Sequence, residues 1–358
     1  MADSGATHQP RRLDGRTRAS SDSKPPENLG RSAFDWSMTL LVILLVFGTY
    51  LDGWAHNTGR TDASFFTPWH AILYAAVFMT TVFLIAELLR RIAQGRSVRT
   101  ALPTGYGLSL IGAGLFILAG VADMVWHLWL GVEAVFEALY SPPHLLLGAS
   151  GIVIAGGPMR AASGPPAAPV PRWSAQLPLL FSLTAILSGL TFLTQDIHWT
   201  LALPAVSHRP PAVAFDDRQI AGLAAILLQT GVMMGMILFA LRRWTLVPGA
   251  LTLILGTNAV AMVFQDRIHR FDLAASAVLA AAIADLLLRM LKPGDDLVRL
   301  RLFAFGVPAV FYTLYFLTLV LVEGVWWSPA LCAGAVILSG FTGVLLSYLV
   351  TPPSAAVP

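Results

Sequence analysis

Residues 36–70 read WSMTLLVILLVFGTYLDGWAHNTGRTDASFFTPWH. An apolar run just long enough to cross a bilayer leads into Asp52 and His56, and a short polar connection then leads to Pro68 and His70 at the start of the next apolar run. The segment therefore predicts two membrane-spanning helices joined by a short loop, with ionisable side chains where the two helices meet the loop.

The composition of the whole chain places this pair of helices in a membrane protein. Of the 358 residues, 56% are hydrophobic and 12% are charged, and the mean hydropathy is +0.69. Because a spanning helix takes about 20 residues, the chain has room for about ten spans and for no sizeable soluble catalytic domain. We predict an all-α, polytopic membrane helix bundle with spans at 36–52, 68–89, 104–127, 142–159, 175–195, 219–241, 246–264, 271–291, 302–322 and 329–350.

The basic residues predict how the bundle is oriented. With the N-terminus in the cytoplasm, 18 of the 23 Lys and Arg residues fall on the cytoplasmic side, where positive charge collects in membrane proteins. Both termini are therefore expected in the cytoplasm, and residues 1–34 are expected to form a disordered cytoplasmic tail. The 21 arginines against 2 lysines hint at a bacterial genome, so we expect a multi-pass protein of the bacterial plasma (inner) membrane. Its partner is the lipid bilayer, and no nucleic-acid signature appears.

One pattern of acidic and imidazole side chains occurs twice in the first half of the chain. An Asp and a His four residues apart end one span, and a second His follows a Pro at the start of the next span. The first triad is Asp52, His56 and His70, and the second triad is Asp123, His127 and His144. The two copies indicate a repeated helix–loop–helix unit.

The spacing explains how the members of a triad can meet. An Asp and a His at positions i and i+4 share one helical face, about 6 Å apart at the β-carbons. Thr67 and Ser141 each precede a proline, which predicts a helix N-cap and places His70 and His144 in the first turn. Each unit then offers one carboxylate and two imidazoles, which leaves coordination positions open to water, dioxygen or substrate.

Two interpretations of the triads are possible from the residues alone. A divalent cation would neutralise a carboxylate near the hydrocarbon boundary and satisfy the imidazole nitrogens. The alternative is a hydrogen-bonded Asp–His network that only locks helices together. The chain has a single cysteine, Cys332, so any metal must be held by His, Asp or Glu.

These motifs resemble a known family, the third or C subunit of the membrane-bound copper monooxygenases, which are the particulate methane and ammonia monooxygenases. The family carries an Asp-Gly-x-x-His motif and then a Phe-Thr-Pro-x-His motif, and segments 52–56 and 66–70 are similar to them. The resemblance extends over about residues 40–155. It implies that the first triad binds copper and that the second triad matches a second proposed site, where the family usually has Asn in place of Asp123.

The resemblance also implies further residues and partners. Glu133 is similar in position to an acidic residue near the second site, and Glu137 lies one helical turn beyond it, so both are expected to support the second triad or bind its ion. The family works with two other subunits, one of which bears a soluble copper domain that nothing in this chain could supply. Other membrane subunits or an electron donor are therefore expected partners of an active protein.

We expect the chain after the N-terminal tail to consist of two parts that meet near residue 160. We expect a four-helix metal-binding unit at 35–160 and six further spans at 161–358, for which a degenerate repeat of the first half is one interpretation. A polar cluster at the outer face is expected from Asp196, His198, Asp266 and His269. A salt-bridged cap involving Arg267 and Arg270 is a simpler interpretation of part of this cluster.

Three functions remain open at this level. The leading hypothesis is a copper-dependent, monooxygenase-like metalloprotein with its sites on the extracytoplasmic side, oxidising a small apolar substrate with dioxygen. The alternatives are a membrane protein that transports or handles copper or another divalent metal, and a structural or assembly subunit without catalysis. Copper follows from the resemblance, whereas iron and zinc are alternatives, because two histidines and one carboxylate also describe non-haem iron sites. No catalytic residue is assigned.

Overall fold

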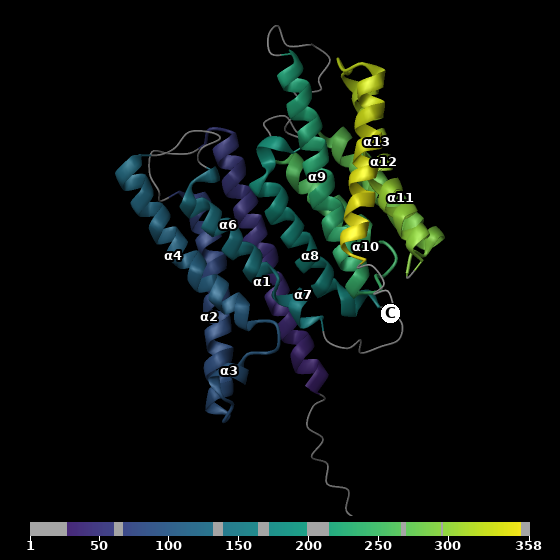
Figure 1. The fold of residues 1–358 in the computed structure, drawn as a ribbon. Helices are drawn as coiled ribbons and strands as arrows, with labels where there is room; N and C mark the ends of the chain where they lie inside the picture. The colour runs from purple at the N-terminus through teal and green to yellow at the C-terminus, as the bar shows by residue number, and fades with distance from the viewer. Residues whose placement is uncertain are drawn as a thin grey trace, which may run out of the picture.

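The structure, a computed structural model, describes residues 27–60, 67–131, 139–163, 172–198, 215–265, 270–294 and 296–351. Helices account for most of these residues, and Figure 1 shows them packed as a single bundle with the N-terminal helices on one side and the C-terminal helices on the other. The elements are α1 (Glu27–Asn57), α2 (Pro68–Ala93), α3 (Val98–Ala101), α4 (Gly107–Leu130), α6 (Pro142–Ala155), α7 (Gly157–Ala161), α8 (Trp173–Leu193), the 3-10 turn η1 (Gln195–Ile197), α9 (Phe215–Arg243), α10 (Ala250–Val263), α11 (Phe271–Leu291), α12 (Leu297–Val322) and α13 (Pro329–Leu349).

Eight helices are long and apolar enough to cross a membrane, which indicates a multi-pass membrane protein. These helices are α1, α2, α4, α8, α9, α11, α12 and α13. The other two predicted spans correspond to α6 and α10, which have 14 residues each. A helix of that length measures about 21 Å, less than the ~30 Å of the hydrocarbon core.

The boundaries differ from the predicted ones at two places. Gly156 interrupts the predicted fourth span and separates α6 from α7. Pro158, at the start of α7, has no N–H to continue the hydrogen-bond ladder from α6. The first helix begins at Glu27, so the last residues of the predicted tail continue α1. Pro25 and Pro26 precede this start, and proline favours a helix N-terminus. Residues 1–26 lie outside the described residues.

The largest apolar core lies in the C-terminal half of the bundle, among α8 to α13. Met234, Phe303 and Tyr312 are among its fully buried side chains. A smaller cluster joins α1, α2, α4 and α6, where Leu73 packs with Phe116 and neighbouring aliphatic side chains. This smaller cluster supports the helix ends that carry the two triads.

A buried polar contact surface links the N-terminal helices to the C-terminal ones. The Tyr50 hydroxyl donates a hydrogen bond to the Ser188 carbonyl at 3.1 Å. The Asn57 side chain donates to Gln195 Oε1 and to the Gln265 carbonyl, both at 3.0 Å, and Gln265 Nε2 donates to the Tyr50 carbonyl at 2.8 Å. These bonds hold the end of α1, which carries the first triad, against the C-terminal half.

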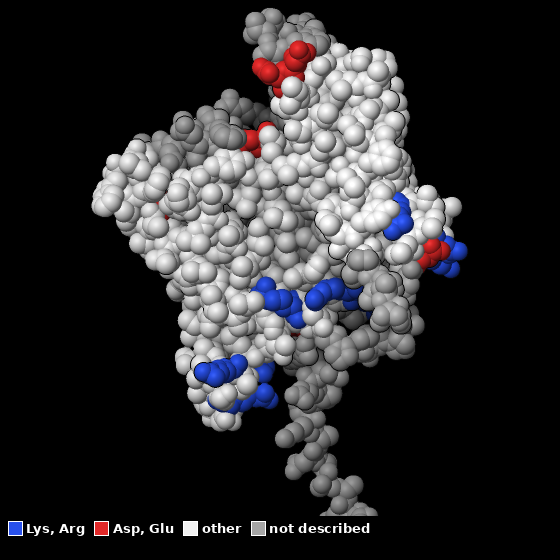
Figure 2. All heavy atoms as spheres, in the orientation of Figure 1, with Lys and Arg blue, Asp and Glu red and all other residues white. Residues whose placement is uncertain are grey.

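Basic side chains are concentrated toward one end of the bundle (Figure 2). α2 ends with Arg90 and Arg91, whereas α9 begins with Asp216 and Asp217 and ends with basic residues. Figure 2 shows most of the visible Lys and Arg side chains on the lower and middle parts of the molecule, with acidic side chains at the top and one acidic group among the basic ones on the right. In the same orientation, α1 begins and α13 ends on the lower side (Figure 1).

Candidate metal centre

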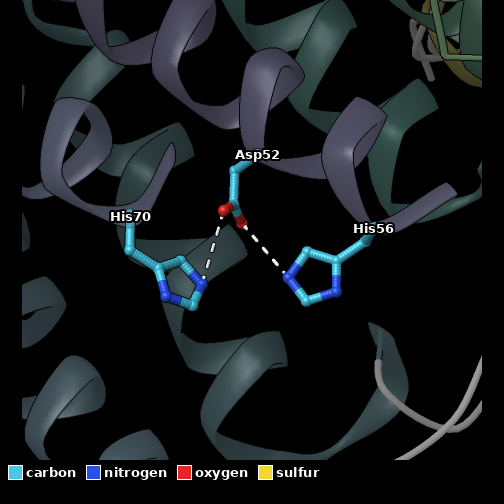
Figure 3. Close-up of side chains that lie close together, drawn as sticks. All are labelled: Asp52, His56 and His70. Carbon is cyan, nitrogen blue, oxygen red and sulfur yellow. Dashed lines mark ion pairs between the residues drawn. The ribbon is translucent and has the colours of Figure 1, made fainter. Parts of the chain in front are cut away.

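The first triad forms where the end of α1 meets the start of α2. Asp52 lies between the two imidazole rings, and both rings point toward its carboxylate (Figure 3). Asp52 Oδ2 lies 3.8 Å from His56 Nε2, and Asp52 Oδ1 lies 3.4 Å from His70 Nε2. The Asp52 and His70 side chains are largely buried, whereas His56 is more exposed, so one side of the triad faces outward.

The second triad forms in the same way between the end of α4 and the start of α6. Asp123 Oδ1 lies 3.4 Å from His127 Nε2 and 3.3 Å from His144 Nδ1. Asp123 is only 2% exposed, so this carboxylate is deeper than the one in the first triad. In both triads one possible ligand atom from each residue lies within 4.8 Å of the others, and each set can therefore hold a metal ion.

The helix starts that carry the third residue of each triad, His70 or His144, agree with the predicted pattern. α2 begins at Pro68 and α6 begins at Pro142, with Thr67 and Ser141 at their N-caps. Thr67 Oγ1 accepts a hydrogen bond from the His70 backbone N–H at 3.2 Å. Ser141 differs, because its hydroxyl lies 2.8 Å from Nδ1 of the His144 ring and makes no cap hydrogen bond to the backbone.

The separations within each triad are at or beyond the long end of the hydrogen-bond range and are compatible with a shared ion. A hydrogen bond between nitrogen and oxygen usually measures about 2.9–3.0 Å, whereas the four Asp–His separations run from 3.3 to 3.8 Å. Ligand atoms arranged tetrahedrally about 2.0–2.1 Å from an ion lie about 3.3 Å from one another. The donor set and its spacing are therefore compatible with a bound metal ion.

Polar contacts around the rings also fit metal ligation. Asp52 Oδ1 is buried and accepts no hydrogen bond within the part of the chain that the structure describes, and a buried carboxylate oxygen left in this state is costly. His127 Nδ1 lies 3.4 Å from the Gly131 carbonyl, which leaves Nε2 directed toward Asp123. Imidazole ligands commonly donate their second N–H to a carbonyl oxygen in this way.

One apolar cavity of about 100 Å³ touches both triads. Asp52 and His70 contribute to its wall from the first triad, and Asp123 and His144 contribute from the second. The rest of the lining is mostly aliphatic and aromatic, and includes Leu45, Leu73, Tyr74, Phe116, Leu147 and Phe192. The two triads are thus connected by a space that accommodates a small apolar molecule, comparable to engineered cavities that bind xenon or benzene.

Sequence reasoning missed the aromatic part of this wall. Tyr74 lies one helical turn beyond His70 on α2, and the two ring centroids are 6.2 Å apart. The Tyr74 ring also packs edge-on against Phe116 at 6.1 Å. The i, i+4 spacing of His70 and Tyr74 was a usable signal for Tyr74, but the contribution of Phe192 from α8 depends on tertiary packing.

The remaining predicted site residues do not join the triads or lie outside the described residues. Five of them lie outside the described residues: Glu133, Glu137, Asp266, Arg267 and His269. Asp196 is exposed on η1, and partial desolvation by neighbouring groups raises the pKa of its carboxyl. His198 is 1% exposed and lines a separate small cavity with Gln229, Asn258 and Tyr312.

The ion pairs near the end of α12 support the simpler interpretation of Arg270. Its guanidinium forms ion pairs with Asp272 at 2.6 Å and with Glu323. These contacts raise the pKa of Arg270, chiefly through the hydrogen bonds from its guanidinium to Asp272. Arg270 therefore ties the start of α11 to the end of α12.

Comparison of the chain with models of protein families, with curated proteins and with solved structures finds no match. The function must therefore be argued from the two triads and the cavity between them.

Proposed function

We propose that each triad binds one divalent metal ion, with Asp52, His56 and His70 as ligands of the first and Asp123, His127 and His144 as ligands of the second. The observation that carries this proposal is the set of Asp–His separations, 3.3–3.8 Å, which suit ligands of a common ion. A cation also neutralises two largely buried carboxylates that have no Lys or Arg among the ion-pair partners described for them.

Copper is the metal that we favour, and oxidation of a small apolar molecule is the activity. The motif resemblance to the C subunit of the copper monooxygenases supports copper, and the mostly apolar cavity between the triads supports the substrate class. Bound copper would supply one-electron and dioxygen chemistry. The chain's own residues hold the ion, exclude water with the aliphatic and aromatic wall, and position the substrate between the two triads.

We further propose that the protein lies in a bacterial plasma membrane with ten crossings and both termini in the cytoplasm. The short helices α6 and α10 make two of these crossings, which requires the bilayer to thin locally around them. The separation of basic and acidic helix ends supports this orientation, as does the position of the start of α1 and the end of α13 on one side of the bundle. In this orientation both triads are on the extracytoplasmic side. Other subunits and an electron donor complete the active protein.

A metal-loading assay tests the binding proposal. The purified protein is loaded separately with copper, iron and zinc, desalted, and analysed for bound metal. We expect two ions in the wild type and one in either Asp52→Asn or Asp123→Asn, because each change removes the anionic ligand of one triad. Asp196→Asn is the matched control, because this exposed carboxylate belongs to neither triad, and it should leave two ions bound.

The other outcomes separate the competing functions. Wild-type protein that stays metal-free after loading contradicts the proposal and favours an Asp–His network that only joins helices. For a metal-loaded protein, oxygen uptake that depends on a small hydrocarbon or ammonia supports the oxidation. Metal flux into vesicles supports transport instead, and metal binding with neither activity favours an assembly role.

A further inference from the structure

A groove on the outer surface of the bundle lies between α2 and α4, beside the first triad. It encloses about 620 Å³ and includes Ile117 and Val121, which project from α4. These two side chains are 44% and 52% exposed, on helices that are apolar enough to cross a membrane. The groove therefore faces the lipid when the bundle lies in a bilayer.

Two side chains separate this groove from the cavity between the triads. His70 and Tyr74 line both the groove and the cavity. Both belong to α2, one helical turn apart. The groove and the inner cavity therefore adjoin each other at these two side chains, which form a shared partition.

Tyr74 fits into a notch in α4 that depends on the absence of a side chain at Gly120. A β-carbon at position 120 would lie 2.7 Å from Tyr74 Cε1 and 2.8 Å from its hydroxyl oxygen, closer than atoms can approach. The tyrosine ring therefore lies against the α4 backbone and closes the gap between the helices. Because side chains change rotamer without backbone movement, rotation of this ring is a small rearrangement that would join the groove to the cavity.

We propose that an apolar molecule of a few heavy atoms, dissolved in the bilayer, reaches the inner cavity through the α2–α4 groove, and that Tyr74 is the gate. The substrate role of this molecule rests on the proposed function. The pathway itself follows from the groove, the shared partition and the notch at Gly120. A bilayer concentrates apolar molecules relative to water, so access from the lipid side suits such a ligand.

Xenon is a suitable probe, because it is apolar, binds dry cavities of this size and does not require a bound metal. Exchange of ¹²⁹Xe between the bulk and the bound state is followed by NMR on the full-length protein in lipid nanodiscs. Gly151→Leu identifies the cavity signal, because Gly151 lines the cavity and a β-carbon there would lie 3.7 Å from Phe116. Gly114→Leu is the matched control, since a β-carbon at Gly114 meets no atom within 4 Å.

Two changes test the gate in opposite directions. Tyr74→Ala should accelerate xenon exchange by about tenfold, and Val121→Trp, which obstructs the groove from its exposed side, should slow it by about tenfold. Leu118→Trp is the matched control for the second change, because Leu118 is 60% exposed on the same helix and does not line the groove. It should leave the rate unchanged.

Two results would overturn the proposal. The first is a folded wild-type protein without a bound-xenon signal that disappears in Gly151→Leu, and the second is an equal rate of xenon exchange in Val121→Trp and Leu118→Trp. The second criterion holds even where Tyr74→Ala fails to fold. Metal content is measured on the same samples. Wild-type protein that binds no metal but exchanges xenon as expected would contradict the proposed function and leave the access route standing. Val121→Trp protein that binds two ions but exchanges xenon at the wild-type rate would contradict only the access route.

Discussion

His198 shows how burial at one residue controls protonation away from the triads. Its side chain is 1% exposed and follows η1, outside the predicted spans. Burial lowers its pKa to about 3, well below the ordinary value of about 6.5. The folded state therefore holds this imidazole in the neutral form at neutral pH.

The lowered pKa of His198 predicts a stability that depends on pH. Above pH ~6.5 the imidazole is neutral in both the folded and unfolded states, so its contribution is fully present there. As the pH falls below that value, the unfolded state binds a proton that the folded state excludes down to about pH 3, and stability falls by about 1.4 kcal/mol per pH unit. Melting temperatures in detergent between pH 7 and 5 should decline more steeply for the wild type than for His198→Gln. Parallel curves would contradict this.

At the scale of elements, a carboxylate of α11 caps the neighbouring α10. Asp285 accepts hydrogen bonds from the backbone N–H groups of Leu251 and Thr252, at 3.3 and 2.7 Å, and from the Thr252 hydroxyl at 2.5 Å. These N–H groups belong to the first turn of α10, which has no partner for them within the helix. A side chain from another helix thus accepts the hydrogen bonds of the free N–H groups at the start of the short helix α10.

Replacing Asp285 should therefore destabilise the contact between α10 and α11. Asp285→Ala leaves buried N–H groups without their acceptor, and we expect a loss of about 1–3 kcal/mol. Asp285→Asn keeps one acceptor oxygen and should lose less. Chemical denaturation in detergent micelles measures both values, and an equal loss in the two variants would argue against the capping role.

Close packing between α12 and α13 depends on one glycine. A β-carbon at Gly343 would clash with the Ala304 carbonyl oxygen, and small residues commonly allow such close contact between membrane helices. Gly343→Ala should force the two helices apart and destabilise the fold by about 1–3 kcal/mol. Gly334→Ala on the same helix meets no atom within 4 Å and should be tolerated. Equal melting temperatures of the two variants would show that the contact can relax.

At the scale of the whole molecule, the charge distribution predicts the topology. Basic residues end α2 and α9, and acidic residues begin α9. This distribution predicts that the ends bearing the triads lie outside the cytoplasm. A reporter at the C-terminus should therefore fluoresce as a green fluorescent protein fusion and be inactive as an alkaline phosphatase fusion. A fusion after Leu130 should behave in the opposite way. The same phosphatase result at both positions would contradict the proposed orientation.

Much of the bundle follows from local properties of the chain. Long apolar runs predict spanning helices because backbone polar groups in lipid must be satisfied within the helix. Thr67 with Pro68 and Ser141 with Pro142 predict the two helix starts that the structure contains. The break at Gly156 and the short length of α10 were not predicted from the sequence, because apolar composition alone does not set the length of a helix.

The sequence by itself determined the helical class, the position of the ligand-bearing turns and the pairing of Asp with His within each helix end. These depend on hydropathy and on spacing over a few residues. The structure places His70 beside Asp52 and His144 beside Asp123, as the spacing predicts. Only the tertiary structure decided that one cavity joins both triads, with Phe192 of α8 in its wall. The physical reason is that helix packing brings together side chains distant in sequence, and local periodicity carries no information about which helix faces meet.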